Sequence, residues 1–174
     1  MINKASLHLN LVQRVRLLLC LAVCLPLVLV SFVVPLKNVS AVDIEGNDHD
    51  NVLYGSMGND KIFGKGGGDR LFGSGGNDTI EAGSGNDFVQ GDIADDIING
   101  NSGNDTVQGG AGNDQVNGDD GNDLVIGSFA NSSMSIKDLA ADTLTCGTGN
   151  DTAFINISDN DTASADCETV IISP

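Results

Sequence analysis

Hydrophobic positions recur every nine residues through the middle of the chain. Starting at Gly46, nine consecutive nine-residue units run without a gap to Ile126. The eighth position of every unit is aliphatic, and these residues are Leu53, Ile62, Leu71, Ile80, Val89, Ile98, Val107, Val116 and Val125. An aliphatic residue flanked by one residue on each side predicts a very short strand over the last three positions of each unit.

Polar positions follow the same period. Position 1 is Gly in eight units, position 4 is Gly in seven, position 5 is Asn in six and position 6 is Asp in eight. Glycine at positions 1 and 4, together with Asn at position 5, predicts backbone that turns through positive φ. A three-residue strand cannot bury a core alone, but stacked copies can. The period therefore predicts an all-β solenoid with position 8 as a continuous interior ladder.

The chain begins with a different pattern. Residues 1–16 contain three bases and no acid, and no charged residue occurs from Leu17 to Val34. Small residues precede a cleavage point after Ala41, so residues 1–41 are predicted to be a secretory signal peptide. An uncleaved N-terminal membrane anchor is the alternative, because the apolar run is long for a signal. Either interpretation places the following residues outside the cell, secreted or on the cell surface.

Composition changes once the first 41 residues are set aside. The 174 residues carry a formal charge of −16, but all 24 acids follow Ala41 and only four of the eight bases do. Four bases against 24 acids leave a net charge of −20 on residues 42–174. Nucleic acid and anionic membrane surfaces would repel such a chain. An aromatic content of 4% fits a narrow core filled by the aliphatic column.

The nine-residue pattern resembles the hemolysin-type calcium-binding repeat of the RTX family, whose consensus is G-G-x-G-x-D-x-U-x with U aliphatic. The resemblance covers residues 46–126. It implies a right-handed parallel β-roll in which two units make one turn and unit n stacks on unit n+2. It also implies calcium ions between successive turns, along both edges of the roll.

The aspartate column gives a physical reason for these ions. Stacking units two apart places Asp60, Asp78, Asp96 and Asp114 on one edge and Asp69, Asp87, Asp105 and Asp123 on the other. Carboxylates about 4.8 Å apart repel by about 3.5 kcal/mol at an effective dielectric near 20. Repeated along both edges, this repulsion predicts an ion-free stack that is unstable. A cation between the turns would reverse it.

Oxygen ligands without His or Cys favour Ca²⁺ over Zn²⁺ or copper. By the family resemblance, carbonyls at positions 2 and 4 join the aspartates, and position 4 is occupied by Gly58, Gly67, Gly76, Gly85, Gly103, Gly112 and Gly121. Pairing aspartates 18 residues apart gives about six ions, which would lower the charge of residues 42–174 from −20 to about −8. His49, Asn51 and Ala94 depart from the pattern, so their sites are predicted to be weaker.

The remaining residues, 127–174, form a less regular tail. The period breaks at Gly127–Ile136 and resumes in two degenerate units, Lys137–Thr145 and Cys146–Phe154. These units are predicted to cap the open end of the roll that spans residues 42–126. Outside the cell, Cys146 and Cys167 are predicted to form a disulfide, with two free thiols as the alternative.

The sequence therefore predicts an exported calcium-binding β-roll that folds when it binds calcium. A surface adhesion or surface-layer component, in which calcium is purely structural, is the alternative. An enzyme is disfavoured, because no G-x-S-x-G or H-E-x-x-H motif occurs and His49 is the only histidine after Ala41. The columns that face outward are too mixed to name a protein or carbohydrate partner.

Overall fold

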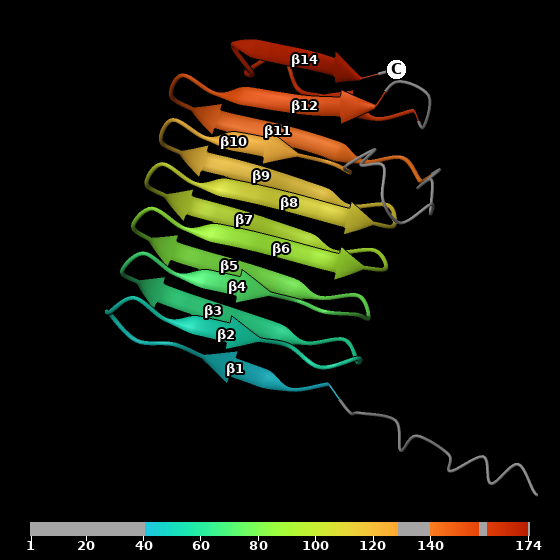
Figure 1. Cartoon of the computed structure of the whole chain (residues 1–174). Helices are drawn as coiled ribbons and strands as arrows, with labels where there is room; N and C mark the ends of the chain where they lie inside the picture. Colours follow the sequence, from blue (N-terminus) through green and yellow to red (C-terminus); the bar gives the residue numbers. More distant parts are fainter. Residues whose placement is uncertain (1–40, 129–139, 157–159, 174) are drawn as a thin grey trace, which may run out of the picture. The chain divides into compact units, whose positions relative to one another are not determined.

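A computed structural model describes residues 41–128, 140–156 and 160–173, which belong to one compact unit. These residues form two seven-stranded parallel sheets and no helix (Figure 1). The first sheet contains β1 (Asp43–Glu45), β3 (Lys61–Gly66), β5 (Thr79–Ser84), β7 (Ile97–Ser102), β9 (Gln115–Asp120), β11 (Thr143–Thr148) and β13 (Thr162–Ala163). The second contains β2 (Val52–Tyr54), β4 (Arg70–Phe72), β6 (Phe88–Ile93), β8 (Thr106–Ala111), β10 (Leu124–Ile126), β12 (Thr152–Asn156) and β14 (Thr169–Ser173).

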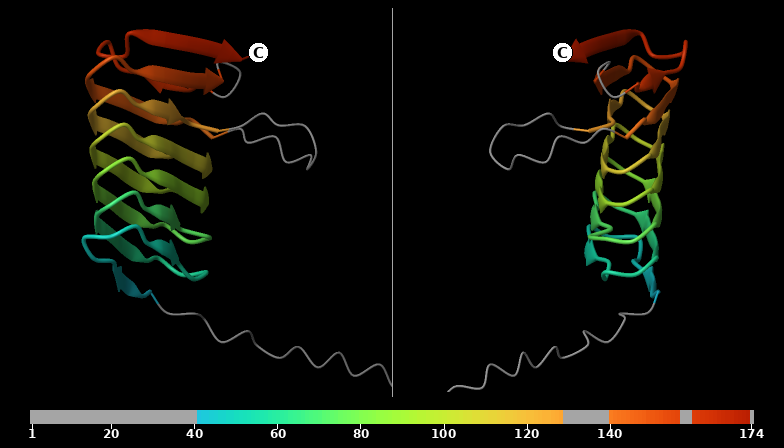
Figure 2. Two further views of the ribbon diagram at one scale, coloured as in Figure 1. Left: turned by 60° about the vertical axis from the view of Figure 1, so that its left-hand side comes forward. Right: turned by 90° about the vertical axis from the view of Figure 1, so that its right-hand side faces the viewer.

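Successive strands lie in opposite sheets, so each strand pairs with the strand two places along the chain. Ile62 of β3 lies opposite Ile80 of β5, and Ile80 lies opposite Ile98 of β7. Each step is 18 residues, or two nine-residue units, which confirms the predicted parallel β-solenoid. Figure 2 shows the two sheets facing each other as the sides of a flat coil.

The interior of the coil is the position-8 column. Nine side chains from both sheets are at most 1% exposed, and they are Ile62, Leu71, Ile80, Val89, Ile98, Val107, Val116, Val125 and Leu144. Ile44 and Leu53, in the first turn, are partly buried against this column. The space between the two sheets is narrow, and the aliphatic side chains of the position-8 column fill it. Such a core needs no aromatic residue.

Many strands are longer than the predicted three residues. In β5, for example, Thr79–Ser84 covers the last three positions of one unit and the first three of the next. The extension stays in register, because Gly83 pairs with Asn101 of the next turn. The prediction of three-residue strands is therefore correct for β2, β4 and β10 and wrong for strands such as β5.

The period break leaves the sheets in register. Val116 of β9 lies opposite Leu144 of β11, and Val125 of β10 lies opposite Ala153 of β12. Each of these steps is 28 residues instead of 18, so the pairing of both sheets continues across ten additional residues of sequence. The degenerate units thus extend both sheets, while the boundary predicted at residue 127 stays a prediction.

Cys146 and Cys167 form the predicted disulfide, with their Cα atoms 5.1 Å apart. Cys146 lies in β11 and is fully buried in the core. The bond ties this strand to the segment that precedes β14. The predicted signal peptide or membrane anchor, residues 1–41, lies outside the described residues except for Ala41.

Candidate metal centre

The position-6 aspartates form one hydrogen-bonded ladder on each edge of the coil. The backbone amide of Asp60 donates to Oδ1 of Asp78 at 2.7 Å, and the amide of Asp78 donates to Oδ1 of Asp96 at 2.8 Å. On the opposite edge, the amide of Asp69 donates to Oδ1 of Asp87 at 2.7 Å, and the pattern continues to Asp123. The structure thus places all eight predicted aspartates in the two predicted rows, and each is 1–4% exposed.

The second carboxylate oxygen has a different environment. In the part of the chain that the structure describes, buried Oδ2 atoms without a hydrogen-bond partner include those of Asp69, Asp78, Asp87, Asp96, Asp105 and Asp123. A buried polar atom without a partner costs about 1–3 kcal/mol, and more when it is charged. Such orphan atoms are rare in folded proteins, so a repeated row of them indicates a missing ligand.

Burial also raises the pKa of several ladder carboxyl groups. The pKa of Asp96 and of Asp105 rises from an ordinary value of 3.8 to about 7, and that of Asp78 and of Asp123 rises to about 6. Loss of water is the largest cause, and repulsion from aspartates in adjacent turns adds to it. Without a cation, the folded coil therefore destabilises the ionised form of these aspartates.

Backbone carbonyl oxygens lie beside the aspartates on each edge of the coil. Positive φ occurs at position 2, as in Ser74 (79°) and Asp119 (72°), and at position 4, as in Gly85 (131°). A Cβ added to Gly85 would lie 1.9 Å from the carbonyl oxygen of Gly67, so the position-4 carbonyl of one turn faces the next turn. A Cβ on Gly83 would lie 2.2 Å from the Lys65 carbonyl oxygen, so the position-2 carbonyl of one turn also faces the next turn.

The glycines at position 1 do not serve to adopt positive φ, as the sequence predicts; they leave space for neighbouring atoms. They do not have positive φ, so that part of the sequence prediction is wrong. A Cβ on Gly91 would instead lie 2.3 Å from Oδ2 of Asp96 and 2.7 Å from the Gly109 carbonyl oxygen. Gly91 therefore leaves space for the carboxylate and for the adjacent turn, although Ala82 occupies position 1 of the preceding unit.

The prediction of positive φ for asparagine at position 5 is also wrong. Its side chain instead forms a second ladder outside the aspartates. The amide of Asn104 donates to Oδ1 of Asn86 at 2.9 Å, and the amide of Asn122 donates to Oδ1 of Asn104 at 2.9 Å. The recurrence of Asn in six units was the available signal, but only the register between turns shows what it does.

These ligands suit calcium. Each edge offers aspartate oxygens and carbonyl oxygens between successive turns, and Ca²⁺ takes six to eight oxygen ligands in irregular geometry. Among residues 41–128, 140–156 and 160–173, no group of three or more His, Cys, Asp or Glu side chains converges on one point. A cation between two turns would therefore depend on backbone carbonyls as well as on the paired aspartates.

A comparison with protein families agrees with this geometry. The family of the RTX calcium-binding nonapeptide repeat matches four overlapping copies, at residues 43–71, 63–98, 72–107 and 90–125. Residues 43–125 belong to this family. The RTX repeats of this chain form a calcium-binding β-roll. No curated protein matches the chain.

The first unit of the RTX roll departs from the repeat as the sequence predicts, and Asp60 in the second unit departs as well. Asn51 stands in the ladder position, and its Oδ1 accepts the Asn47 amide at 2.8 Å. The Oδ2 atom of Asp60 accepts the Ser56 amide at 2.5 Å. In both side chains, one oxygen therefore accepts a hydrogen bond from a backbone amide of the same nine-residue unit. Ala94, which replaces a position-4 glycine, still has a positive φ of 85°.

The ladder also extends beyond the RTX match, which the sequence prediction of metal ligands missed. The amide of Asp114 donates to Oδ1 of Asp142 at 2.9 Å, and that of Asp123 donates to Oδ1 of Asp151 at 2.7 Å. Asp142 and Asp151 are each 1% exposed. Their place at position 6 of the degenerate units is visible in the sequence, which predicts a cap there instead of metal ligands.

The described part of the chain contains no helix long and apolar enough to cross a membrane.

Proposed function

We propose that this RTX roll binds calcium between successive turns along both edges and folds as it does so. The row of buried aspartate Oδ2 atoms without hydrogen-bond partners is the observation that carries the proposal. Each ion would supply these oxygens with a partner and offset the repulsion between adjacent turns. Because the sites exist only when turns are stacked, binding free energy would become folding free energy.

The proposed ligands are the eight aspartates of the two ladders and the carbonyls at positions 2 and 4. Position 4 contributes Gly58, Gly67, Gly76, Gly85, Gly103, Gly112 and Gly121. Aspartates 18 residues apart define about six ions within the RTX match. These ions would reduce the net charge of residues 42–174 from −20 to about −8, which lowers the self-repulsion of the coil.

Export of the protein is part of the same proposal. The Cys146–Cys167 disulfide supports an oxidising compartment, since cytosolic proteins seldom keep structural disulfides. Extracellular calcium modules bind with a Kd of about 10⁻⁴–10⁻³ M, so an exported roll would fold only after leaving the cell. Residues 1–41 would direct this export and be removed, or would remain as an anchor.

Binding is proposed instead of catalysis. The ladder aspartates are committed to neighbouring amides, and His49 is exposed in the first turn. A surface adhesion or surface-layer component is the second candidate. Exposed apolar side chains on β14, such as Ile171 at 42% and Ile172 at 56%, favour it because they offer a surface to a partner.

Circular dichroism of residues 36–174, the compact unit, tests the proposal during a calcium titration and a parallel magnesium titration. We expect β signal to appear with calcium and not with equal concentrations of magnesium. A folded spectrum that is the same with EDTA and with calcium would contradict calcium-dependent folding. It would instead favour a solenoid that needs no ion.

A further inference from the structure

The C-terminal end of one aspartate ladder contains a buried carboxylate that the RTX match does not cover. Asp151 is 1% exposed, and its Oδ2 atom has no hydrogen-bond partner among the described residues. Its Oδ1 accepts the Asp123 amide at 2.7 Å, as every ladder aspartate does. Asp123, in the preceding turn, has a buried Oδ2 atom in the same condition. Two orphan oxygens therefore occur in adjacent turns at this end.

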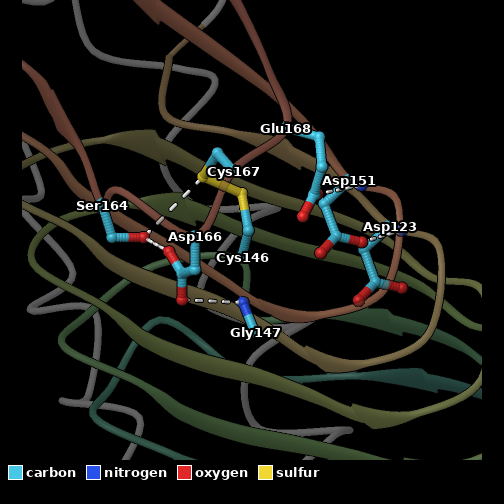
Figure 3. Close-up of a disulfide and its surroundings, with 8 residues drawn as sticks. All are labelled: Asp123, Cys146, Gly147, Asp151, Ser164, Asp166, Cys167 and Glu168. Carbon is cyan, nitrogen blue, oxygen red and sulfur yellow. Dashed lines mark hydrogen bonds between the residues drawn. A yellow bond between two sulfur atoms is a disulfide. The ribbon is translucent and has the colours of Figure 1, made fainter.

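Glu168 continues this ladder by one more turn. The Asp151 amide donates to Oε2 of Glu168 at 2.8 Å, and the Thr169 amide donates to the Asp151 carbonyl at 3.1 Å. The same backbone contact occurs between ordinary repeats, where the Thr106 amide donates to the Asp87 carbonyl at 2.9 Å. Glu168 thus occupies a position-6 site, although it lies 17 residues after Asp151. Figure 3 shows the three carboxyl groups of Asp123, Asp151 and Glu168 in one row.

The carbonyl columns continue through the same turns. Gly149 has a φ of +156°, and a Cβ added to it would lie 1.4 Å from the Gly121 carbonyl oxygen. Gly147 has a φ of +99°, and its Cβ would lie 2.0 Å from the Asp119 carbonyl oxygen. Both kinds of oxygen ligand found between the RTX repeats are therefore present next to Asp151.

The disulfide fixes the segment that carries Glu168. Cys167 directly precedes Glu168, and its partner Cys146 is fully buried in β11. The Gly147 amide also donates to Oδ2 of Asp166 at 3.1 Å (Figure 3). Two adjacent attachments thus hold residues 166–168 against the turn that contains Asp151.

The other edge of the roll ends differently. Asp161 accepts the Asp142 amide on Oδ1 at 3.0 Å and the Asn156 amide on Oδ2 at 2.8 Å. Backbone amides therefore satisfy both oxygens of the last aspartate on that edge. The equivalent last carboxylate on the Asp151 edge is Glu168, whose Oε2 accepts the Asp151 amide and whose side chain is exposed. The Oδ2 atom of Asp151, one turn earlier, is buried without a hydrogen-bond partner among the described residues.

We infer that Asp151 is a shared ligand of two further calcium ions, one between Asp123 and Asp151 and one between Asp151 and Glu168. This inference rests on the proposed calcium binding by the repeats. The second site combines a degenerate unit with a glutamate outside any repeat, and the Cys146–Cys167 disulfide assembles it. Calcium would thus bind to the tail as well as to the RTX roll.

Calcium bound per chain, measured by equilibrium dialysis of residues 36–174 at one saturating free calcium concentration, tests the inference. We expect Glu168→Ala to lose one ion and Asp151→Ala to lose two. Asp95→Asn is the control and should lose none. It removes one charge at position 5, where six other units already have Asn.

Circular dichroism at the same calcium concentration shows whether each variant is folded. Glu168 is exposed, so its variant remains informative even where Asp151→Ala fails to fold. An unchanged ion count in Glu168→Ala and in folded Asp151→Ala would overturn the inference and leave calcium binding by the repeats intact. An unmodified chain that binds no calcium would instead overturn the proposed function itself.

Discussion

The backbone amide of Asp78 donates to Oδ1 of Asp96, one full turn along the coil, at a distance of 2.8 Å. This contact fixes the register of the two turns and uses one oxygen of Asp96. The other oxygen, Oδ2, is buried without a hydrogen-bond partner among the described residues. A single side chain thus stabilises the stacking through one atom and opposes it through the other, unless a cation is bound.

Asp96→Asn separates these two effects. The amide oxygen still accepts the Asp78 amide, while the buried charge is removed. We expect the ion-free roll to gain about 1–3 kcal/mol of unfolding free energy and the calcium-bound roll to lose a comparable amount. Circular dichroism of residues 36–174 in EDTA measures the first change as a gain of β signal, and urea unfolding in millimolar calcium measures the second. Changes of the same sign in the two conditions would contradict the dual role of Asp96.

The raised pKa values predict that acid stabilises the ion-free roll. Unfolded aspartates bind their protons below a pH of about 4, whereas folded Asp96 and Asp105 bind them below about 7 and folded Asp78 and Asp123 below about 6. Between these limits the folded chain binds more protons, so lowering the pH from 8 to 5 favours folding. Each pKa unit is worth about 1.4 kcal/mol at one site.

Circular dichroism of residues 36–174 in EDTA at pH 8, 7, 6 and 5 measures this gain as β signal that appears on acidification. In calcium the direction should reverse, because protons compete with the ion for the same carboxylates and lower its affinity. Calcium-free stability that stays constant or falls on acidification would show that the ladder does not carry buried charge.

The fold could be predicted from the sequence because every unit repeats the same physical problem. A column such as Ile62, Ile80 and Ile98 can be buried only by stacking, and the 18-residue step follows from two units per turn. The aspartate rows follow from the same step. The family resemblance supplied the pairing of units, and the observed register confirms it.

Contacts that depend on register between turns could not be predicted. Asn104 looks like a turn residue in the sequence, yet its side chain accepts the Asn122 amide of the next turn. Glu168 lies 17 residues after Asp151, so a search at the nine-residue period misses it. Asp142 stands at position 6 of a degenerate unit, but the sequence does not show that it pairs with Asp114, 28 residues earlier. Both sheets keep their register across the period break, and the sequence contains no signal for that.

Burial along the position-8 column predicts a large difference between two neighbouring isoleucines. Ile98 is fully buried, whereas Ile97 in the same strand is 44% exposed. Ile98→Ala should lower the unfolding free energy of the calcium-bound roll by about 2–5 kcal/mol, because it leaves a cavity between two closely spaced sheets. Ile97→Ala should change it by less than about 1 kcal/mol. Similar losses from both variants would show that the core is not confined to this column.

Backbone geometry at the edges predicts a similar contrast between two glycines. Gly103 has a φ of +134°, and an added Cβ would lie 1.7 Å from the Gly85 carbonyl oxygen. Gly103→Ala should therefore push two turns apart and cost at least about 2 kcal/mol, because backbone strain adds to the clash. At Gly75 an added Cβ would make ordinary contacts, 3.6 Å from the Met57 side chain. Gly75→Ala should keep wild-type stability within about 1 kcal/mol.

Thermal unfolding of both glycine variants in calcium, with ion counts from equilibrium dialysis, measures this difference. Gly103→Ala should also lose calcium, because the position-4 carbonyl that faces the next turn is displaced with the backbone. If Gly103→Ala retains both its stability and its full ion count, the close approach of adjacent turns is not required for the metal sites. Loss of ions in Gly75→Ala would likewise show that the contrast between the two positions is wrong.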